Sequence, residues 1–275
     1  MSARKQLVVN ADDFGFTTDV NEGIVEAHRR GIVTATTLMA NGAAFEDAVR
    51  LARETPTLDV GCHLVLVSGS SPLTGKPYPA TVARLLAAMA KRQIRVYDEL
   101  AAQVRRVVEA GIQPTHLDTH KHTHLWPPVL EAVARLAGES GIGWVRRPFD
   151  LPLTTLRGAV PVARRMTSAG LGFLRKRFHR VLSRHGCRTT GHFAGFQITG
   201  LYRTAELVEL LGAIPEGSTE LMVHPGRCRE ALRQARTRLK ESRERELAAL
   251  VAAETRQAIE RHGIELVNYC GLAVD

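Results

Sequence analysis

Two adjacent carboxylates, Asp12 and Asp13, follow a short apolar run near the start of the chain. Like charges placed side by side repel each other, so the pair is costly unless a cation or a shared proton lies nearby. The preceding residues 6–11 are typical of a buried strand, which places the pair at its carboxyl end, where α/β proteins bind ligands. Taken without the histidines described next, the pair would equally suit a turn that caps the following helix.

Histidines in two later segments could supply ligands to a cation. His63 lies within a short apolar stretch, and the histidine cluster of residues 116–124 contains four histidines in nine positions. A lone histidine in an apolar strand is more often a hydrogen-bonded core residue, but four imidazoles so close together rarely serve packing alone. Together with the aspartates they indicate a metal-dependent hydrolase, which needs neutral or anionic ligands and an open position for water.

Each candidate residue has a role in that chemistry. One carboxylate and two imidazoles suit a catalytic divalent ion, and Asp13, His63 and His120 are the candidate ligands. Asp12 is the candidate general base, and His224, which ends an apolar run in a His-Pro-Gly turn, is the candidate general acid. Which histidine of the cluster reaches the metal depends on the turn there, so the residues alone leave that choice open.

The elements that must position these side chains alternate between strand-like and helix-like stretches. Strands are expected at residues 6–11, 34–39, 58–67, 115–119, 143–147, 220–224 and 265–269, and helices at 19–30, 43–54, 81–92, 98–110, 127–140 and, as one or two helices, 230–261. This order implies parallel strands with right-handed crossovers. Candidate residues at several strand ends favour an α/β fold of the (β/α) barrel type, related to the TIM barrel and with eight strands or fewer, over an open doubly wound sheet.

The composition is that of an ordinary globular protein, with 275 residues of which 44% are hydrophobic and 24% charged. No linker divides the chain, so residues 1–275 are expected to form a single domain. No apolar run is long enough to predict a membrane helix, and the N-terminus lacks a signal-peptide pattern, so a cytoplasmic location is expected. The four cysteines form no C-x-x-C pair, which argues against a zinc knuckle or a disulfide framework.

The net charge of +9 comes from one segment of the chain. Residues 151–205 contain ten Lys or Arg and no acidic residue, whereas the rest carries 27 basic and 28 acidic residues. This local excess argues against a nucleic-acid partner. Basic and apolar residues interleave over 164–184 and predict an amphipathic helical insertion. The helix could simply cover the barrel or contact a second copy, or it could approach anionic lipid or a glycolipid.

Five blocks of the sequence resemble the YdjC-like carbohydrate deacetylases. They are VNADDFG (9–15), NEGIVEAHRRGIVTATTLMANG (21–42), VGCHLVL (60–66), PTHLDTHKHTHLWP (114–127) and ELMVHPG (220–226). Together the blocks are specific, although DDFG alone would not be, and the similarity runs over nearly the whole chain. The resemblance implies a barrel-like α/β fold. It also implies hydrolysis of an N-acetyl group from a saccharide or glycolipid that contains N-acetylglucosamine.

The resemblance also assigns roles to residues. It implies Asp12 as base, His224 as acid, and Asp13, His63 and His120 as metal ligands, the last because it follows Asp-Thr where the family has Asp-Ser-His. It implies magnesium as the ion and a homodimer as the assembly. Two imidazoles and a carboxylate suit zinc, cobalt or nickel better than a hard cation, so zinc is the chemical alternative.

Four further residues are candidates for orienting ligands or substrate. With the ligands assigned by resemblance, Asp118 and His124 are expected to hold ligands or substrate in place. Arg146 and Arg147 follow the strand expected at 143–147, and they could hydrogen-bond sugar hydroxyls or Asp12. Ordinary surface charge is the alternative for this arginine pair.

Two other functions remain open at the level of sequence. Clustered Asp and His also serve phosphoryl chemistry, so a metal-dependent phosphoesterase is one alternative, and release of phosphate instead of acetate would identify it. A basic membrane- or nucleic-acid-binding protein is the other, and it predicts salt-sensitive binding that survives loss of Asp12 and His63. A binding role leaves the dispersed Asp and His residues unexplained.

Overall fold

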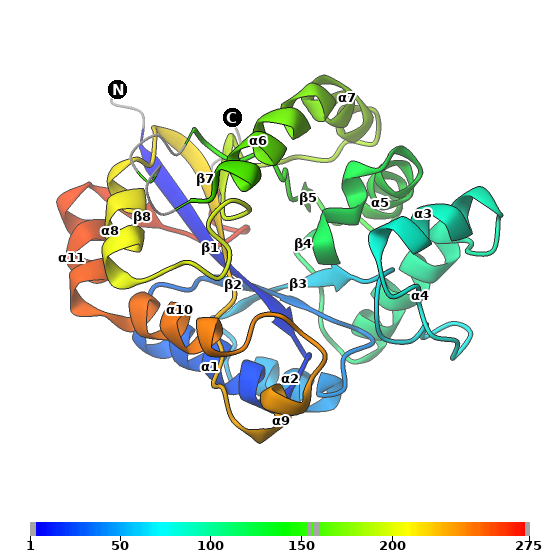
Figure 1. The fold of residues 1–275 in the computed structure, drawn as a ribbon, viewed down its shortest axis with the longest axis horizontal. Coiled ribbons are helices and arrows are strands. Elements are labelled where there is room, and N and C mark those ends of the chain that lie inside the picture. The colour runs from blue at the N-terminus through cyan, green and yellow to red at the C-terminus, as the bar shows by residue number, and fades with distance from the viewer. Residues whose placement is uncertain (1–3, 153–155, 157–159, 273–275) are drawn as a thin grey trace.

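A curled, wholly parallel sheet forms the centre of the molecule (Figure 1). The structure, a computed structural model, describes residues 4–152, 156 and 160–272. Seven strands lie in the order β5-β4-β3-β2-β1-β7-β6, and β8 pairs with the first half of β1. The strands are β1 Lys5–Phe14, β2 Ala35–Leu38, β3 Asp59–Leu64, β4 His116–Thr119, β5 Trp144–Val145, β6 His192–Ala194, β7 Gly217–Val223 and β8 Ile264–Leu266.

Two isolated parallel bridges link each outer strand to the segment next to the other: Trp144 of β5 pairs with Arg188, before β6, and Phe193 of β6 pairs with Asp150, after β5. The sheet therefore curls toward closure instead of remaining open with two free edges. This confirms the predicted class, an α/β barrel-like fold related to the TIM barrel, with seven strands on its main path.

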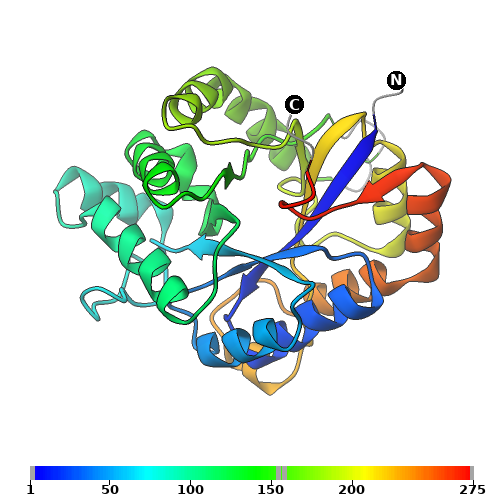
Figure 2. The same cartoon turned by 180° about the vertical axis from the view of Figure 1, so that it is seen from behind.

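Helices surround the sheet (Figures 1 and 2). They are α1 Thr18–Arg30, α2 Phe45–Arg53, α3 Val82–Ala90, α4 Val96–Glu109, α5 Pro127–Glu139, α6 Val162–Leu171, α7 Arg175–Arg184, α8 Thr204–Gly212, α9 Glu230–Gln234, α10 Glu241–Val251 and α11 Ala253–Arg261, with 3-10 segments η1 His120–Leu125 and η3 Gly172–Leu174. Among the described residues, no helix combines the length and the apolar character that a bilayer crossing requires.

Strand β1 shows how the sequence divides the two faces of the sheet. Leu7 and Val9 are fully buried in the main core between sheet and helices, where burial of each stabilises the fold by roughly 1.5–3 kcal/mol. Val8 belongs to a second, smaller cluster on the opposite, inner face. Because successive side chains alternate, Asn10 and Asp12 continue the inward row toward the carboxyl end. The inner face is thus apolar at one end and polar at the other.

The structure differs from the predicted elements mainly in the second half of the chain. The basic segment 151–205 contains α6, η3 and α7, but also strand β6, which the sequence did not predict. Residues 153–155 and 157–159 of this segment lie outside the described part. Helix α8 was also missed, and residues 230–261 form three helices instead of one or two. A three-residue strand such as β6 is too short to show the alternation on which a sequence prediction depends.

Candidate active site

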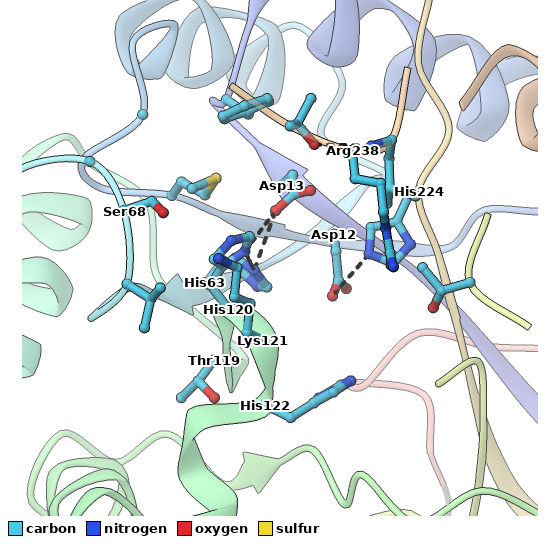
Figure 3. A pocket seen from close by; sticks show the side chains of 18 of the residues that line it. Asp12, Asp13, His63, Ser68, Thr119, His120, Lys121, His122, His224 and Arg238 are labelled. Atoms are coloured by element: carbon cyan, nitrogen blue, oxygen red, sulfur yellow. Dashed lines mark hydrogen bonds and ion pairs between the residues drawn. The ribbon is translucent and has the colours of Figure 1, made fainter. Parts of the chain in front are cut away.

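Both adjacent carboxylates reach the same cavity because the end of β1 is irregular. In a regular strand Asp12 and Asp13 would point to opposite faces of the sheet. The pairing of β1 with β2 shifts register between Ala11 and Phe14, and Asp13 has a left-handed φ of 70°. An aspartate tolerates this conformation better than most residues, at a cost of about 1–2 kcal/mol. The bulge turns the second carboxylate back toward the cavity (Figure 3).

The cavity has a volume of about 730 Å³ and lies at the carboxyl ends of the strands. Two aspartates and four histidines line it, and the rest of the lining is partly apolar and partly basic. The lining residues are Asp12, Asp13, Phe16, Met39, Asn41, Gly42, Ala43, His63, Val67, Ser68, Gly69, Thr119, His120, Lys121, His122, Arg164, Phe196, Thr199, Met222, His224, Arg236, Thr237, Arg238, Leu239 and Arg243.

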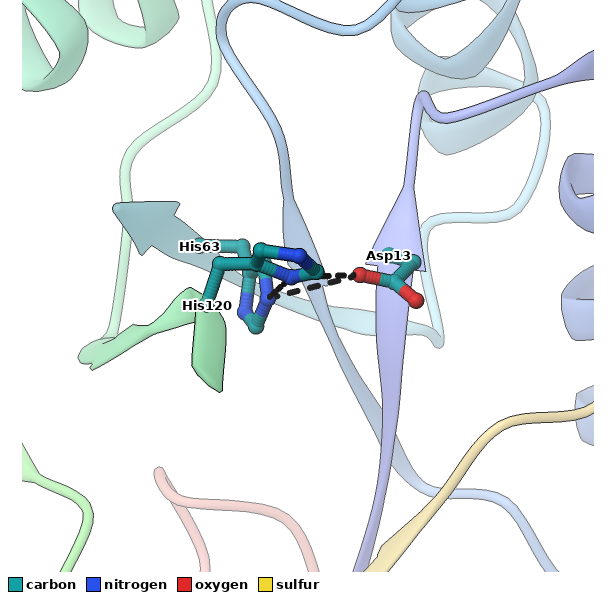
Figure 4. Close-up of side chains that lie close together, drawn as sticks. All are labelled: Asp13, His63 and His120. Carbon is teal, nitrogen blue, oxygen red and sulfur yellow. Dashed lines mark hydrogen bonds and ion pairs between the residues drawn. The ribbon is translucent and has the colours of Figure 1, made fainter. Parts of the chain in front are cut away.

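Three side chains form a small triangle on the cavity floor (Figure 4). Asp13 Oδ1 lies 3.4 Å from His63 Nε2 and 3.3 Å from His120 Nδ1, and the two imidazole nitrogens are 3.3 Å apart. Ligands about 2.1 Å from a tetrahedral ion are roughly 3.4 Å apart, so the triangle matches the first shell of a transition metal. Asp13 Oδ1 is buried and has no hydrogen bond of ordinary geometry among the described residues. Donor type and spacing both fit a divalent ion.

Asp118 orients one of these donors. His63 Nδ1 donates to Asp118 Oδ1 at 2.7 Å, which leaves Nε2 to face Asp13, and Thr37 Oγ1 donates to the other oxygen of Asp118 at 3.1 Å. A carboxylate behind a ligating histidine fixes its ring and raises its basicity. Burial alone would lower the pKa of His63, but Asp118, Asp12 and Asp13 raise it to about 9. The cluster therefore strongly favours a positive charge.

Arg146 connects the floor of the cavity to the interior of the barrel. It is buried and forms a bidentate pair with Asp12 at 2.6 and 2.7 Å, while it also contacts Asp118 and Glu220, each at 2.5 Å. Burial alone would raise the pKa of Asp12, but Arg146 and two nearby histidines hold it well below its usual range. Asp12 is thus ionised at neutral pH. One guanidinium serves three carboxylates here.

His224 lies beside Asp12 on the cavity wall, with its Nε2 4.0 Å from Asp12 Oδ2 (Figure 3). Its backbone N–H donates to the buried Glu246 at 2.6 Å. The turn that follows packs closely on α1, because a Cβ on Gly23 would clash with the Cα of Gly226. Burial lowers the pKa of His224 to about 4 despite the nearby carboxylates. The imidazole is therefore neutral at neutral pH.

The histidine cluster divides into different roles because the chain turns sharply there. Lys121 and His122 have left-handed φ values of 56° and 50°, which reverse the chain after β4. His120 faces Asp13, and His122 lines the cavity and contacts the rings of Phe193 and Phe196. His124 lies between Thr119 Oγ1 at 2.5 Å and the carbonyl of Arg146 at 3.0 Å. His124 therefore holds the backbone of Arg146 in place and does not line the cavity.

Two arginines differ from the sequence expectations. Arg147 donates to the backbone carbonyl of Gly191 and is not among the residues that line the cavity, so its neighbour Arg146 alone reaches Asp12. Arg243, which the sequence did not single out, is buried and pairs with Asp13. It lies in a helix with five charged residues among its first six, so no local pattern separates it from the solvated ones.

Glu220 could have been found from the sequence. It lies two positions before Met222 and four before His224, on the same face of β7 by alternation. An acidic residue at an inward position of an apolar strand indicates a buried partner, which the structure identifies as Arg146.

The fold and the site together define an α/β barrel-like protein with an Asp/His cluster, suited to a divalent ion, at the carboxyl ends of its strands. The YdjC-like protein family model matches residues 6–261, so the chain belongs to this family. It is 36% identical over 275 residues to a carbohydrate deacetylase of Brevibacillus brevis, covering 97% of this chain and 99% of that protein.

Two further comparisons agree with this placement. The chain is 43% identical over 143 residues to a chitooligosaccharide deacetylase of Salmonella typhimurium, covering 50% of this chain and 57% of that protein. Among solved structures, a putative cellobiose-phosphate cleavage protein of Enterococcus faecalis superposes with a TM-score of 0.77 at 26% identity, covering 99% of this chain and 100% of that one. The shared barrel-like fold thus extends over nearly the whole chain.

Proposed function

We propose that the protein is a metal-dependent carbohydrate deacetylase that removes an N-acetyl group from an amino sugar. The observation that carries the proposal is the triangle of Asp13, His63 and His120 beside an ionised carboxylate outside the triangle, Asp12. Relatives named carbohydrate deacetylase and chitooligosaccharide deacetylase support the same activity. The cavity of about 730 Å³ is large enough for a small saccharide.

Asp13, His63 and His120 would hold the ion, which supplies Lewis-acid chemistry when bound. Two imidazoles and one carboxylate favour zinc or a similar transition metal over magnesium, the ion implied by family resemblance. Asp118 behind His63 fixes the ring for that contact. Arg146 keeps Asp12 ionised and fixed without occupying the cavity itself.

In the reaction Asp12 accepts a proton from the attacking water. His224 donates a proton to the nitrogen of the leaving amine, and the products are acetate and the free amino sugar. Because its pKa is about 4, His224 begins the reaction neutral, so the proton that it donates is the one that Asp12 has taken from the water and passed on. His224 Nε2 lies 4.0 Å from Asp12 Oδ2, a proximity that supports a role for both side chains at one reacting group.

The experiment that tests this proposal measures acetate release from N,N′-diacetylchitobiose by metal-stripped protein, with zinc, cobalt, nickel or magnesium restored singly. We expect release that depends on the metal and that is highest with a transition metal. The same samples are tested for phosphate release from p-nitrophenyl phosphate. Phosphate release without acetate release would replace the deacetylase by the phosphoesterase alternative.

A lipid-linked form of the substrate is favoured by the solvent face of α6, η3 and α7. Val162, Met166 and Phe173 on this face have exposed fractions of 60%, 70% and 92%, and residues 161–184 include seven Lys or Arg and no acidic residue. Arg164 points the other way, since it lines the cavity and donates to the carbonyl of Thr199. Apolar side chains between cations are typical of surfaces that dock on anionic lipid.

We therefore propose that this face contacts a membrane that carries the acetylated sugar. The test is co-sedimentation with phosphatidylglycerol vesicles, with phosphatidylcholine vesicles for comparison. Phe173→Ser should weaken sedimentation, whereas Leu73→Ser, which changes an exposed leucine elsewhere on the surface, should not. Equal sedimentation with both lipids, or with both variants, would contradict the proposal. The homodimer expected from the sequence stays a prediction.

A further inference from the structure

One buried arginine on the cavity wall has a free donor. Arg243 of α10 is 1% exposed, yet it lines the cavity. Its Nη2 donates to Asp13 Oδ2, and its Nε donates to the carbonyl of Leu239 at 3.3 Å. Its remaining terminal nitrogen, Nη1, is buried and has no hydrogen-bond partner among the described residues. A buried cationic donor without a partner is costly, so an acceptor is expected to complete it.

The position of Arg243 indicates where that acceptor would come from. On one side the guanidinium contacts Asp13, the candidate metal ligand. On the other side its stem packs against the turn after His224, because a Cβ on Gly226 would lie 3.2 Å from its Cδ. The backbone N–H of Gly226 also donates to the carbonyl of Arg243 at 3.3 Å. Arg243 thus lies between the metal ligand and the candidate acid, beside the place where the acyl group must react.

We propose that Arg243 is a catalytic residue whose Nη1 donates to the acyl oxygen of the substrate while its Nη2 holds Asp13. The inference rests on the proposed deacetylase function. Water attack forms a C–O bond and moves the carbonyl electron pair onto the acyl oxygen, and Asp12 takes the proton of the water. That proton passes from Asp12 to His224, and when the electron pair returns, the C–N bond breaks and the nitrogen leaves with its electrons and the proton from His224.

Arg243 keeps its own protons throughout and stabilises the negative charge that develops on the acyl oxygen. Loss of one such preorganised donor typically lowers kcat about 10²- to 10³-fold. A purely structural role is the competing explanation, in which Arg243 serves only as the counterion of Asp13. That role acts through the metal site. A substitution of Arg243 would then lower metal affinity, and its effect on kcat would disappear at saturating metal.

The experiment compares Arg243→Lys and Arg243→Gln with Arg245→Gln, which changes an exposed arginine of the same helix. Metal affinity is measured by titration calorimetry, and kcat and KM are measured at saturating metal. We expect both Arg243 variants to lose about 10²- to 10³-fold in kcat with little change in KM, and the Arg245 variant to match the wild type. The lysine variant keeps the charge beside Asp13, so it covers the case in which the glutamine variant does not fold.

Two results would overturn the assignment. If saturating metal restores wild-type kcat to the Arg243 variants, Arg243 only positions Asp13. If the metal-loaded wild type and Arg243→Lys bind acetate equally tightly by calorimetry, Nη1 does not contact an acyl oxygen. The acetate titration needs no turnover, so it still decides the role of Arg243 if the wild type deacetylates no sugar. In that case the proposed deacetylase function is wrong, whatever the acetate titration shows for Arg243.

Discussion

Two groups of charged residues lie next to each other in this barrel, and they differ in how completely they are paired. In the interior, Asp12, Asp118 and Glu220 contact one guanidinium at 2.5–2.7 Å. At the cavity floor, Asp13 faces His63 and His120 at 3.3–3.4 Å. All three interior carboxylates contact Arg146, although Glu220 Oε2 has no hydrogen bond of ordinary geometry among the described residues. The floor group instead has the composition and spacing of an ion's ligands.

The contrast shows how one strand end can provide both a base and a ligand. Asp12 continues the inward row of β1 and is held by Arg146, which keeps it ionised and away from the ligand triangle. Asp13 leaves that row through the bulge and turns to the histidines. The backbone irregularity therefore separates two identical side chains into two chemical roles.

The largest effect is expected from removing the candidate base, Asp12, which belongs to the interior group and acts beside the floor group. Asp12→Asn keeps the shape of the base but removes its ability to accept a proton, so we expect kcat to fall about 10²- to 10⁴-fold. The Asp13 triangle is unchanged, so the metal content should stay at the wild-type level. Both are measured on the same preparation, by acetate release and by elemental analysis. Loss of metal together with activity would show that the two groups do not act separately.

The second test concerns the arginine at the centre of the interior group. Arg146→Met leaves three buried carboxylates without their cation, and we expect the free energy of unfolding to fall by about 3–5 kcal/mol. Arg147→Met is the matched control, because within the described part of the chain this arginine hydrogen-bonds only the carbonyl of Gly191, and we expect a loss of roughly 0.5–1.5 kcal/mol. Denaturant unfolding measures both. Equal losses would mean that Arg146 contributes no more to the free energy of unfolding than Arg147 does.

The sequence predicts much of this comparison, and the part that it misses has a physical reason. Alternating strands and helices indicate the barrel, and the aspartates and histidines at strand ends indicate the site. The pairing of Asp12 with Arg146 spans 134 positions, and that of Asp13 with Arg243 spans 230, so no local pattern reports them. The bulge at Asp13 is equally invisible, because it depends on the register between β1 and β2.

A smaller effect is expected at the residue shared by both groups. Asp118 accepts from His63 and contacts Arg146, so Asp118→Asn keeps one hydrogen bond but removes the charge behind the histidine. We expect metal affinity to weaken about 10- to 100-fold, measured by titration calorimetry. Asp150→Asn is the control, because this half-buried carboxylate accepts backbone N–H groups elsewhere and should alter stability alone. Equal weakening in both variants would indicate a general loss of folding.

The smallest effect concerns the proton balance of the interior. Three carboxylates share one guanidinium, and burial raises the pKa of Glu220 from 4.5 to about 7 even though Arg146 opposes the shift. Between pH 4.5 and about 7, Glu220 is therefore protonated in the folded protein and ionised in the unfolded chain. Its contribution to stability is fully present below pH 4.5 and is lost as the pH rises to about 7. His224 and His124, whose pKa values are lowered, have the opposite effect over an overlapping range.

Glu220→Gln isolates this contribution, because the wild type and the variant share the same contributions from His224 and His124. The variant carries no titrating group at this position, so its stability relative to the wild type should increase by about 1–3 kcal/mol between pH 5 and pH 7.5. Denaturant unfolding at both pH values measures the difference. Parallel stability curves would mean that Glu220 is ionised throughout. In that case Arg146 neutralises the interior more completely than its single charge suggests, and the contrast with the cavity floor would be sharper.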